Sequence, residues 1–166
     1  MLIAQVGRIS KQKNQLFSLE VMKLFFKQNP KARCMFFGDV NDRDMGDEIR
    51  LAHNERISLL PPDAENIDAI YDASDVVLVP SIAEGGLSFV AVEASRSGCQ
   101  VFMNESLGKI GGDLPNVHYL PLEERTWVSE LGKVDPSILG TRRTQDLPGV
   151  YSLEHSMAQY LELYGG

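Results

Sequence analysis

Short, almost wholly apolar segments recur along this chain, and a segment with helical periodicity separates each of them from the next. The apolar segments occupy residues 2–6, 32–37, 56–60, 75–79 and 100–103. Strands that are apolar on both faces are typical of parallel sheets that helices cover on both sides. The alternation therefore predicts an α/β domain with a Rossmann-like, doubly wound parallel sheet.

Helical patterns and chain breakers fix the rest of the predicted organisation. Helices are expected at residues 12–28, 45–54, 64–73, 89–97, 124–131 and 152–164. Gly98 is a natural left-handed helix stop, and the glycine and proline breaks between residues 135 and 149 favour a loop. The 166 residues suit one hydrophobic core, so we expect a single domain over residues 1–166. Within it, residues 150–166 would form a closing C-terminal helix.

Composition excludes several classes of function. The formal net charge of −7 argues against a general nucleic-acid surface, which needs a basic face. No apolar run approaches the roughly 18 residues of a membrane span, and the N-terminus lacks the features of a signal peptide. We therefore expect a soluble, cytoplasmic chain. The two cysteines, Cys34 and Cys99, lie in strand-like surroundings and are expected to fill core space rather than to bind zinc or form a disulfide.

The predicted sheet also predicts where a ligand binds. In doubly wound sheets, ligands lie at the carboxyl ends of the strands, near the point where the strand order reverses. The candidate site therefore comprises the loops that follow Val6, Phe37, Leu60, Val79 and Met103.

One cluster of candidate residues follows the first strand. Gly7 permits a tight turn, Arg8 offers a planar fork for a phosphate, and Lys13 adds a second cation. The alternative is that these are exposed, solubilising residues at a helix start. Cations there oppose the helix dipole, which favours anions at that end.

A second cluster follows the fourth strand. Gly85 and Gly86 allow bare backbone amides to approach an anion, and a helix N-terminus near Ser88 supplies further amides. Glu84 lies in this loop. Glu93 lies in the helix among apolar neighbours, so we expect a buried carboxylate that needs a functional partner. The alternative is a plain turn followed by a solvated glutamate.

Taken in order, these motifs resemble the C-terminal, donor-binding domain of a large family of retaining glycosyltransferases with the GT-B architecture, the group 1, or family 4-like, enzymes. The resemblance covers essentially the whole chain. The matching positions are Gly7-Arg8 with Lys13, Gly38-Asp39, the strand and Pro-Ser at 75–81, Glu84 through Glu93-Ala94 with Gly98, and the ending at 151–164.

The resemblance implies transfer of a sugar, with retention of configuration, from a nucleotide-diphosphate sugar, most often UDP- or GDP-linked. It implies neither a bound metal nor a cofactor. Arg8, Lys13 and Glu84 would be the catalytic residues, with the two cations holding the diphosphate and Glu84 approaching the sugar hydroxyls.

The implied donor-binding residues extend around the whole edge of the sheet. Glu93 would accept hydrogen bonds from the ribose hydroxyls, and the backbone near Leu59 and Leu60 would contact the base. The full implied set is Gly7, Arg8, Lys13, Gly38, Leu59, Leu60, Glu84, Gly85, Gly86, Leu87, Ser88 and Glu93.

Two departures from the family pattern bear on function. Eight residues separate Glu84 from Glu93, whereas the family usually has seven, so the contact of Glu84 is either kept through a longer loop or lost. A GT-B enzyme also needs an N-terminal acceptor domain, which is absent from this sequence. The chain would then be a fragment or one subunit of a split enzyme. Its partners would be the nucleotide-sugar and that domain, through which any peripheral membrane association would come.

Other readings fit less well. The G-x-S-x-G pattern of a hydrolase fails at Val90, and Arg43 occupies a ligand position in a segment that only faintly resembles a calcium loop. Asp42-Arg43-Asp44 has the form of a metal motif from another glycosyltransferase architecture, but the strand order does not suit it. Two hypotheses remain: a catalytic donor domain, or a module that binds a nucleotide or nucleotide-sugar without chemistry.

Overall fold

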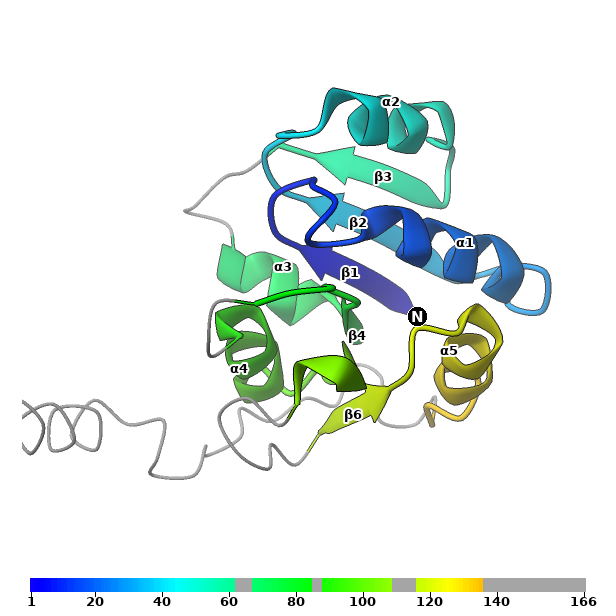
Figure 1. Cartoon of the computed structure of the whole chain (residues 1–166). Coiled ribbons are helices and arrows are strands. Elements are labelled where there is room, and N and C mark those ends of the chain that lie inside the picture. Colours follow the sequence, from blue (N-terminus) through cyan, green and yellow to red (C-terminus); the bar gives the residue numbers. More distant parts are fainter. Residues whose placement is uncertain (62–66, 85–87, 109–115, 136–166) are drawn as a thin grey trace, which may run out of the picture.

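Six parallel strands form a single sheet in the order β3-β2-β1-β4-β5-β6 (Figure 1). The computed structural model describes residues 1–61, 67–84, 88–108 and 116–135. The strands are β1 (Leu2–Val6), β2 (Arg33–Phe37), β3 (Ile57–Leu60), β4 (Val76–Val79), β5 (Gln100–Asn104) and β6 (Val117–Leu120). The chain proceeds outward from β1 to β3 and then returns to build the other half from β4. The strand order therefore reverses between β1 and β4, and the predicted doubly wound, Rossmann-like sheet is confirmed.

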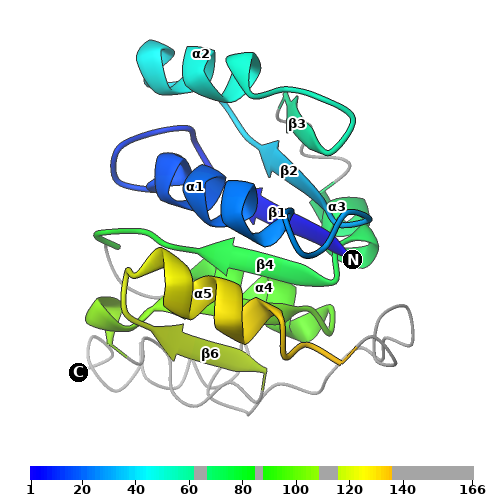
Figure 2. The ribbon, with the colours of Figure 1, turned by 90° about the vertical axis from the view of Figure 1, so that its right-hand side faces the viewer.

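Helices cover both faces of this sheet. One layer consists of α1 (Gln15–Phe25), α2 (Arg43–Leu51) and α5 (Glu124–Leu131), and the other of α3 (Ile67–Ala73) and α4 (Phe89–Arg96). A short 3-10 turn, η2 (Glu105–Leu107), follows β5. Figure 2 shows α1 and α5 side by side on one face of the sheet.

The strands are apolar on both faces because each face has its own core. In β4, Val76 and Leu78 pack with α1, α2 and α5, whereas Val77 and Val79 pack with α3 and α4. Cys34 lies in the first core and Cys99 in the second, and both are buried. No disulfide joins these two residues, which both belong to the described part of the chain, so their predicted role as core residues is confirmed.

Element boundaries agree closely with the sequence predictions, with two informative differences. Helix α1 was expected from residue 12 but begins at Gln15, because Asn14 adopts a left-handed conformation with φ 56° and ψ 44°. Strand β6 was not predicted, because the polar His118 interrupts its short apolar sequence. In the structure its other three residues are only partly buried. The predicted helix at 152–164 and nearly all of the predicted loop at 135–149 lie outside the described residues.

Among the described helices, none combines the length and apolar character that crossing a membrane requires.

Candidate functional site

The loops after β1 and β4 meet where the strand order reverses. Lys13, in the first loop, places its Nζ 2.6 Å from Oε1 of Glu84, in the second. Both side chains are largely shielded, with 18% and 11% of their surfaces exposed. The structure thus brings together two of the residues predicted for catalysis, at the reversal of strand order, which is where doubly wound sheets generally bind ligands.

Hydrogen bonds on either side of this ion pair join the same two loops. The carbonyl of Gln12 accepts from the amide of Ile82 at 2.9 Å, and the Gln12 side chain donates to the carbonyl of Ala83 at 3.0 Å. Asn14 Nδ2 donates to the carbonyl of Pro80 at 3.3 Å. The ion pair is therefore held between two loops whose backbones are tied together, so its geometry does not depend on two long side chains alone.

Two buried side-chain amides donate hydrogen bonds to backbone carbonyls of these loops. Neither residue was selected in the sequence analysis. Gln5 in β1 is 2% exposed and donates through Nε2 to the carbonyl of Lys13 at 2.7 Å. Asn104, at the end of β5, donates to the carbonyl of Ser81 at 2.8 Å. The available signal was a polar amide within, or directly after, an otherwise apolar strand, because such a buried group needs a hydrogen-bond partner.

The remaining residues of the first cluster lie at the edge shared with β2. Gly7 has a φ of 131°, and Gly38 has a φ of 150°. A Cβ atom on Gly38 would lie 2.3 Å from the carbonyl oxygen of Gly7, so this close approach of two loops requires glycine. Arg8 is exposed, and within the described residues no carboxylate pairs with its guanidinium. Its backbone carbonyl accepts from Gln15 Nε2 at 2.8 Å, which fixes the position of the residue.

The second cluster departs from expectation at Glu93. The expectation of a buried carboxylate was wrong: Glu93 is exposed, because α4 turns Ala91, Ala94 and Ser95 toward the sheet and leaves Glu93 on its outer side. The carboxylate nevertheless has a protein partner, since the hydroxyl of Tyr71 in α3 donates to its Oε2 at 2.8 Å.

Ser88 is the N-cap residue of α4. It is 4% exposed, and its hydroxyl accepts from the amide of Ala91 at 3.4 Å. The cap thereby uses one of the amides that the helix N-terminus was expected to offer. The other predicted donors of this loop, Gly85, Gly86 and Leu87, lie outside the described residues.

The predicted base-binding residues line a pocket of about 450 Å³ at the β3 edge of the sheet. Gly38, Leu59 and Leu60 contribute to it, together with Arg50 and His53 from the end of α2 and the turn that follows. Arg50 also pairs with Asp47 at 2.8 Å. This pocket lies at the carboxyl ends of β2 and β3. The amide of Gly7, in the loop that leads to Lys13, donates to the carbonyl of Phe37 at the end of β2 at 2.9 Å.

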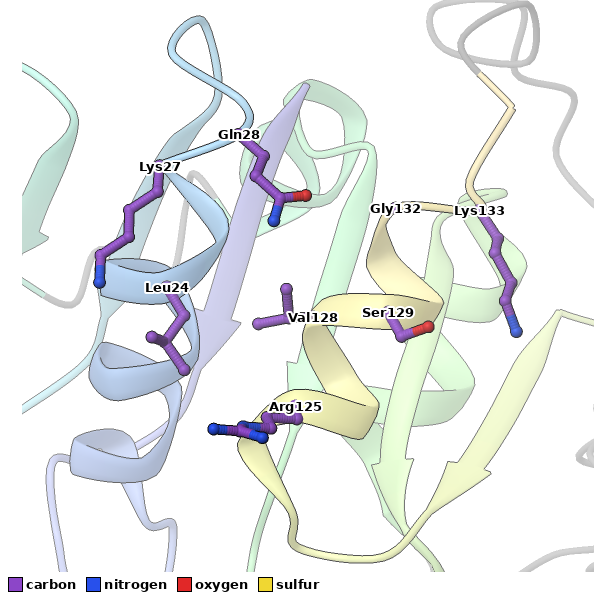
Figure 3. A pocket seen from close by; sticks show the side chains of 8 residues that line it. All are labelled: Leu24, Lys27, Gln28, Arg125, Val128, Ser129, Gly132 and Lys133. Carbon is purple, nitrogen blue, oxygen red and sulfur yellow. The ribbon is translucent and has the colours of Figure 1, made fainter.

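A pocket of about 570 Å³ lies elsewhere, between the C-terminal end of α1 and α5 (Figure 3). Leu24 and Val128 face each other across it, and Lys27, Arg125 and Lys133 stand around its rim. It contains none of the predicted site residues. Because it lies toward the last turn of α1, it is remote from the carboxyl ends of the strands.

Within the described residues, no group of three or more His, Cys, Asp or Glu side chains lies close enough to hold a metal ion.

Comparison with known proteins gives one family match and many structural matches. A family model described as glycosyl transferases group 1 matches residues 1–109. A comparison with curated proteins gives no significant match. Among solved structures, the C-terminal domain of a glycosyl transferase group 1 family protein, LpcC from Francisella tularensis, has a TM-score of 0.64 at 20% identity, covering 84% of this chain and 78% of that one.

Two larger proteins are also similar. HepE from Anabaena, solved in complex with UDP and with UDP-glucose, has a TM-score of 0.71 at 18% identity, over 98% of this chain and 48% of its own. TarM has a TM-score of 0.80 at 17% identity, over 99% of this chain and 35% of its own. A mutant of S. aureus TarM, solved in a complex that includes UDP, gives the same values. At such identities the likeness establishes the fold. This chain spans about half the length of HepE and about a third of that of TarM.

Proposed function

Because this chain belongs to the group 1 glycosyl transferase family, we propose that it is the donor-binding domain of a retaining enzyme that moves a sugar from a nucleotide-diphosphate sugar to an acceptor. Its parallel sheet has the Rossmann-like fold of GT-B glycosyltransferases. HepE and TarM, which were solved with UDP or a UDP-sugar, support a UDP-sugar as the first donor to test. In this proposal the acceptor is chosen by a second domain or subunit, the reaction needs no metal, and the protein works in the cytoplasm.

One observation carries the proposal: the Lys13–Glu84 pair lies at the reversal of strand order. A cation at this position suits a diphosphate, and a carboxylate beside it suits sugar hydroxyls, which donate hydrogen bonds. The eight-residue spacing between Glu84 and Glu93 left open whether Glu84 reaches the site. Its contact with Lys13 supports the reading in which the longer loop still delivers the carboxylate to the proposed site.

Arg8 adds a second, exposed cation to the loop that carries Lys13. Its exposed guanidinium has no carboxylate partner among the described residues, so it is available to an anionic ligand in a protein whose net charge is −7. A bidentate contact with the diphosphate would place positive charge where negative charge develops as the nucleotide leaves. The pocket at Leu59 and Leu60 would then accept the base.

Calorimetric titration of the chain with UDP, GDP and ADP tests the proposal. We expect one nucleotide to bind with a Kd on the order of 0.1–1 mM, and uridine without phosphates to bind far more weakly. Arg8→Ala should weaken binding by more than about tenfold, since a charge-assisted hydrogen bond contributes roughly 1.5–3 kcal/mol. Lys11→Ala is the matched control, because it removes an exposed cation of the same loop and should change the Kd less than about twofold.

Two results would oppose the proposal. Absence of binding of all three nucleotides at millimolar concentration would remove the donor site. Equal losses of nucleotide affinity in Arg8→Ala and Lys11→Ala would show that the loop attracts anions nonspecifically and holds no defined donor site. The non-catalytic alternative predicts the same nucleotide binding. An assay for release of UDP from a UDP-sugar, with the chain joined to an acceptor domain, distinguishes the two hypotheses.

A further inference from the structure

We infer that Tyr71 is a positioning residue for ribose recognition: its hydroxyl fixes the carboxylate of Glu93 in the orientation that accepts the ribose diol of the donor nucleotide. The inference rests on the proposed function, within which Glu93 is the expected ribose ligand. It assigns a role to a residue that the sequence analysis did not select.

The two side chains contrast sharply in their surroundings. Tyr71 is 1% exposed and packs in the core between the sheet and helices α3 and α4. Its backbone carbonyl also accepts a hydrogen bond from Cys99 Sγ at 3.2 Å, which links this turn of α3 to the segment between α4 and β5. Glu93, by contrast, is exposed on the outer side of α4. A buried donor thus contacts an exposed acceptor.

The contact leaves the carboxylate able to bind a diol. The Tyr71 hydroxyl donates to Oε2 at 2.8 Å and occupies one acceptor position on that oxygen. A carboxylate has about four lone-pair positions over its two oxygens, so further positions remain for two ribose hydroxyls. Holding the glutamate in one rotamer before the ligand arrives reduces the entropic cost that immobilising a flexible side chain otherwise adds to binding.

The tyrosine also stays a donor throughout the useful pH range. Burial raises the pKa of Tyr71, and its hydrogen bond to Glu93 raises the pKa further. The hydroxyl therefore keeps its proton, and the carboxylate remains the acceptor in this pair.

The test compares ribose preference rather than affinity alone. UDP, 2′-deoxy-UDP and 3′-deoxy-UDP are titrated into the wild type and into Tyr71→Phe, Glu93→Gln and Asp68→Asn, with the corresponding GDP series in parallel. We expect the wild type to prefer UDP over each deoxy analogue about tenfold, and Glu93→Gln to lose this preference. Tyr71→Phe should retain the ring and its packing but reduce the preference to about threefold or less, with little change in the affinity for the deoxy analogues.

Asp68→Asn is the matched control, because it alters a charge that acts on Tyr71 from the same helix without removing the hydroxyl. It should keep the wild-type preference. A tie between α3 and α4 that serves only stability would lower the melting temperature of Tyr71→Phe but leave its ribose preference unchanged, and that result overturns the inference. Nucleotide binding with no ribose preference in the wild type also overturns it while leaving the proposed function intact. Absence of all nucleotide binding defeats both.

Discussion

Lys13 and Glu84 form an ion pair of 2.6 Å between the loops that follow β1 and β4, although 71 positions separate them in the sequence. In the ligand-free domain, Glu84 therefore competes with any anion for the ammonium of Lys13. The pair couples the phosphate part of the proposed site to its sugar part. If Lys13 leaves Glu84 for a diphosphate, Glu84 becomes available to sugar hydroxyls.

Glu84→Gln is expected to tighten the binding of UDP. The substitution removes a negative charge from the proposed site and releases Lys13 for the diphosphate, which corresponds to about 0.5–1 kcal/mol, or a two- to fivefold lower Kd, for a partly shielded pair. Calorimetry of the wild type, Glu84→Gln and Glu124→Gln checks this. Glu124 is an exposed glutamate on α5, so its variant has the same change in net charge and should bind UDP as the wild type does. Weaker UDP binding by Glu84→Gln would contradict competition for Lys13.

The contributions of Lys13 and Glu84 to the free energy of unfolding are expected to depend on each other. Lys13→Met leaves a carboxylate with 11% of its side chain exposed and without its cation, and should cost roughly 1–2 kcal/mol of unfolding free energy. In the double variant with Glu84→Gln, most of this loss should disappear, because no unpaired charge remains. Urea denaturation of the four proteins in a double-mutant cycle measures the coupling. A coupling energy near zero would show that water already solvates both groups.

The sequence was sufficient for β1 to β5 because these strands are short, largely apolar and separated by periodic helices. The two cores that contain Val76 with Leu78 and Val77 with Val79 are the physical reason for that pattern. Strand β6 escaped prediction because its four residues include the polar His118, which is exposed, and three side chains that are only partly buried, so the segment lacks a continuous apolar run.

The site was predictable to the level of its loops, but its hydrogen bonds were not. The tie between Gln12 and residues 82 and 83 depends on the way two distant loops lie together, which no local pattern encodes. The burial of Glu93 was mispredicted because apolar neighbours in the sequence do not share one side of a helix. The orientation of α4 against the sheet decides which of them is covered.

Gly38→Ala is expected to be severely destabilising, by about 3 kcal/mol or more, because it combines a backbone φ of 150° with a Cβ atom 2.3 Å from the Gly7 carbonyl oxygen. Gly108→Ala separates these two causes, since Gly108 also has a positive φ, 68°, but no atom within 4 Å of the added Cβ. The control should cost about 1–2 kcal/mol. Thermal and urea denaturation of both variants provide the comparison, and equal losses would show that the two loops separate easily.

His118 is expected to make the domain less stable on mild acidification. Its ring stacks on Phe102 with centroids 4.8 Å apart, and its Nε2 lies 2.8 Å from Gln100 Oε1. Burial lowers the pKa of His118 below its usual 6.5, an effect that Glu130 partly offsets. The unfolded chain therefore takes up a proton more readily than the folded one, so the stabilisation is complete above pH 6.5 and declines as the pH falls through that value toward the lower folded pKa.

Urea denaturation at pH 7.5 and at pH 5.5 measures this effect, with His118→Phe as the comparison, because phenylalanine retains a ring against Phe102 and does not titrate. The wild type should lose more unfolding free energy between the two pH values than the variant does. The carboxylates common to both proteins cancel in that difference. An equal or larger loss in His118→Phe would mean that the histidine is as well solvated in the fold as in the unfolded chain, and that the acid sensitivity arises from other groups.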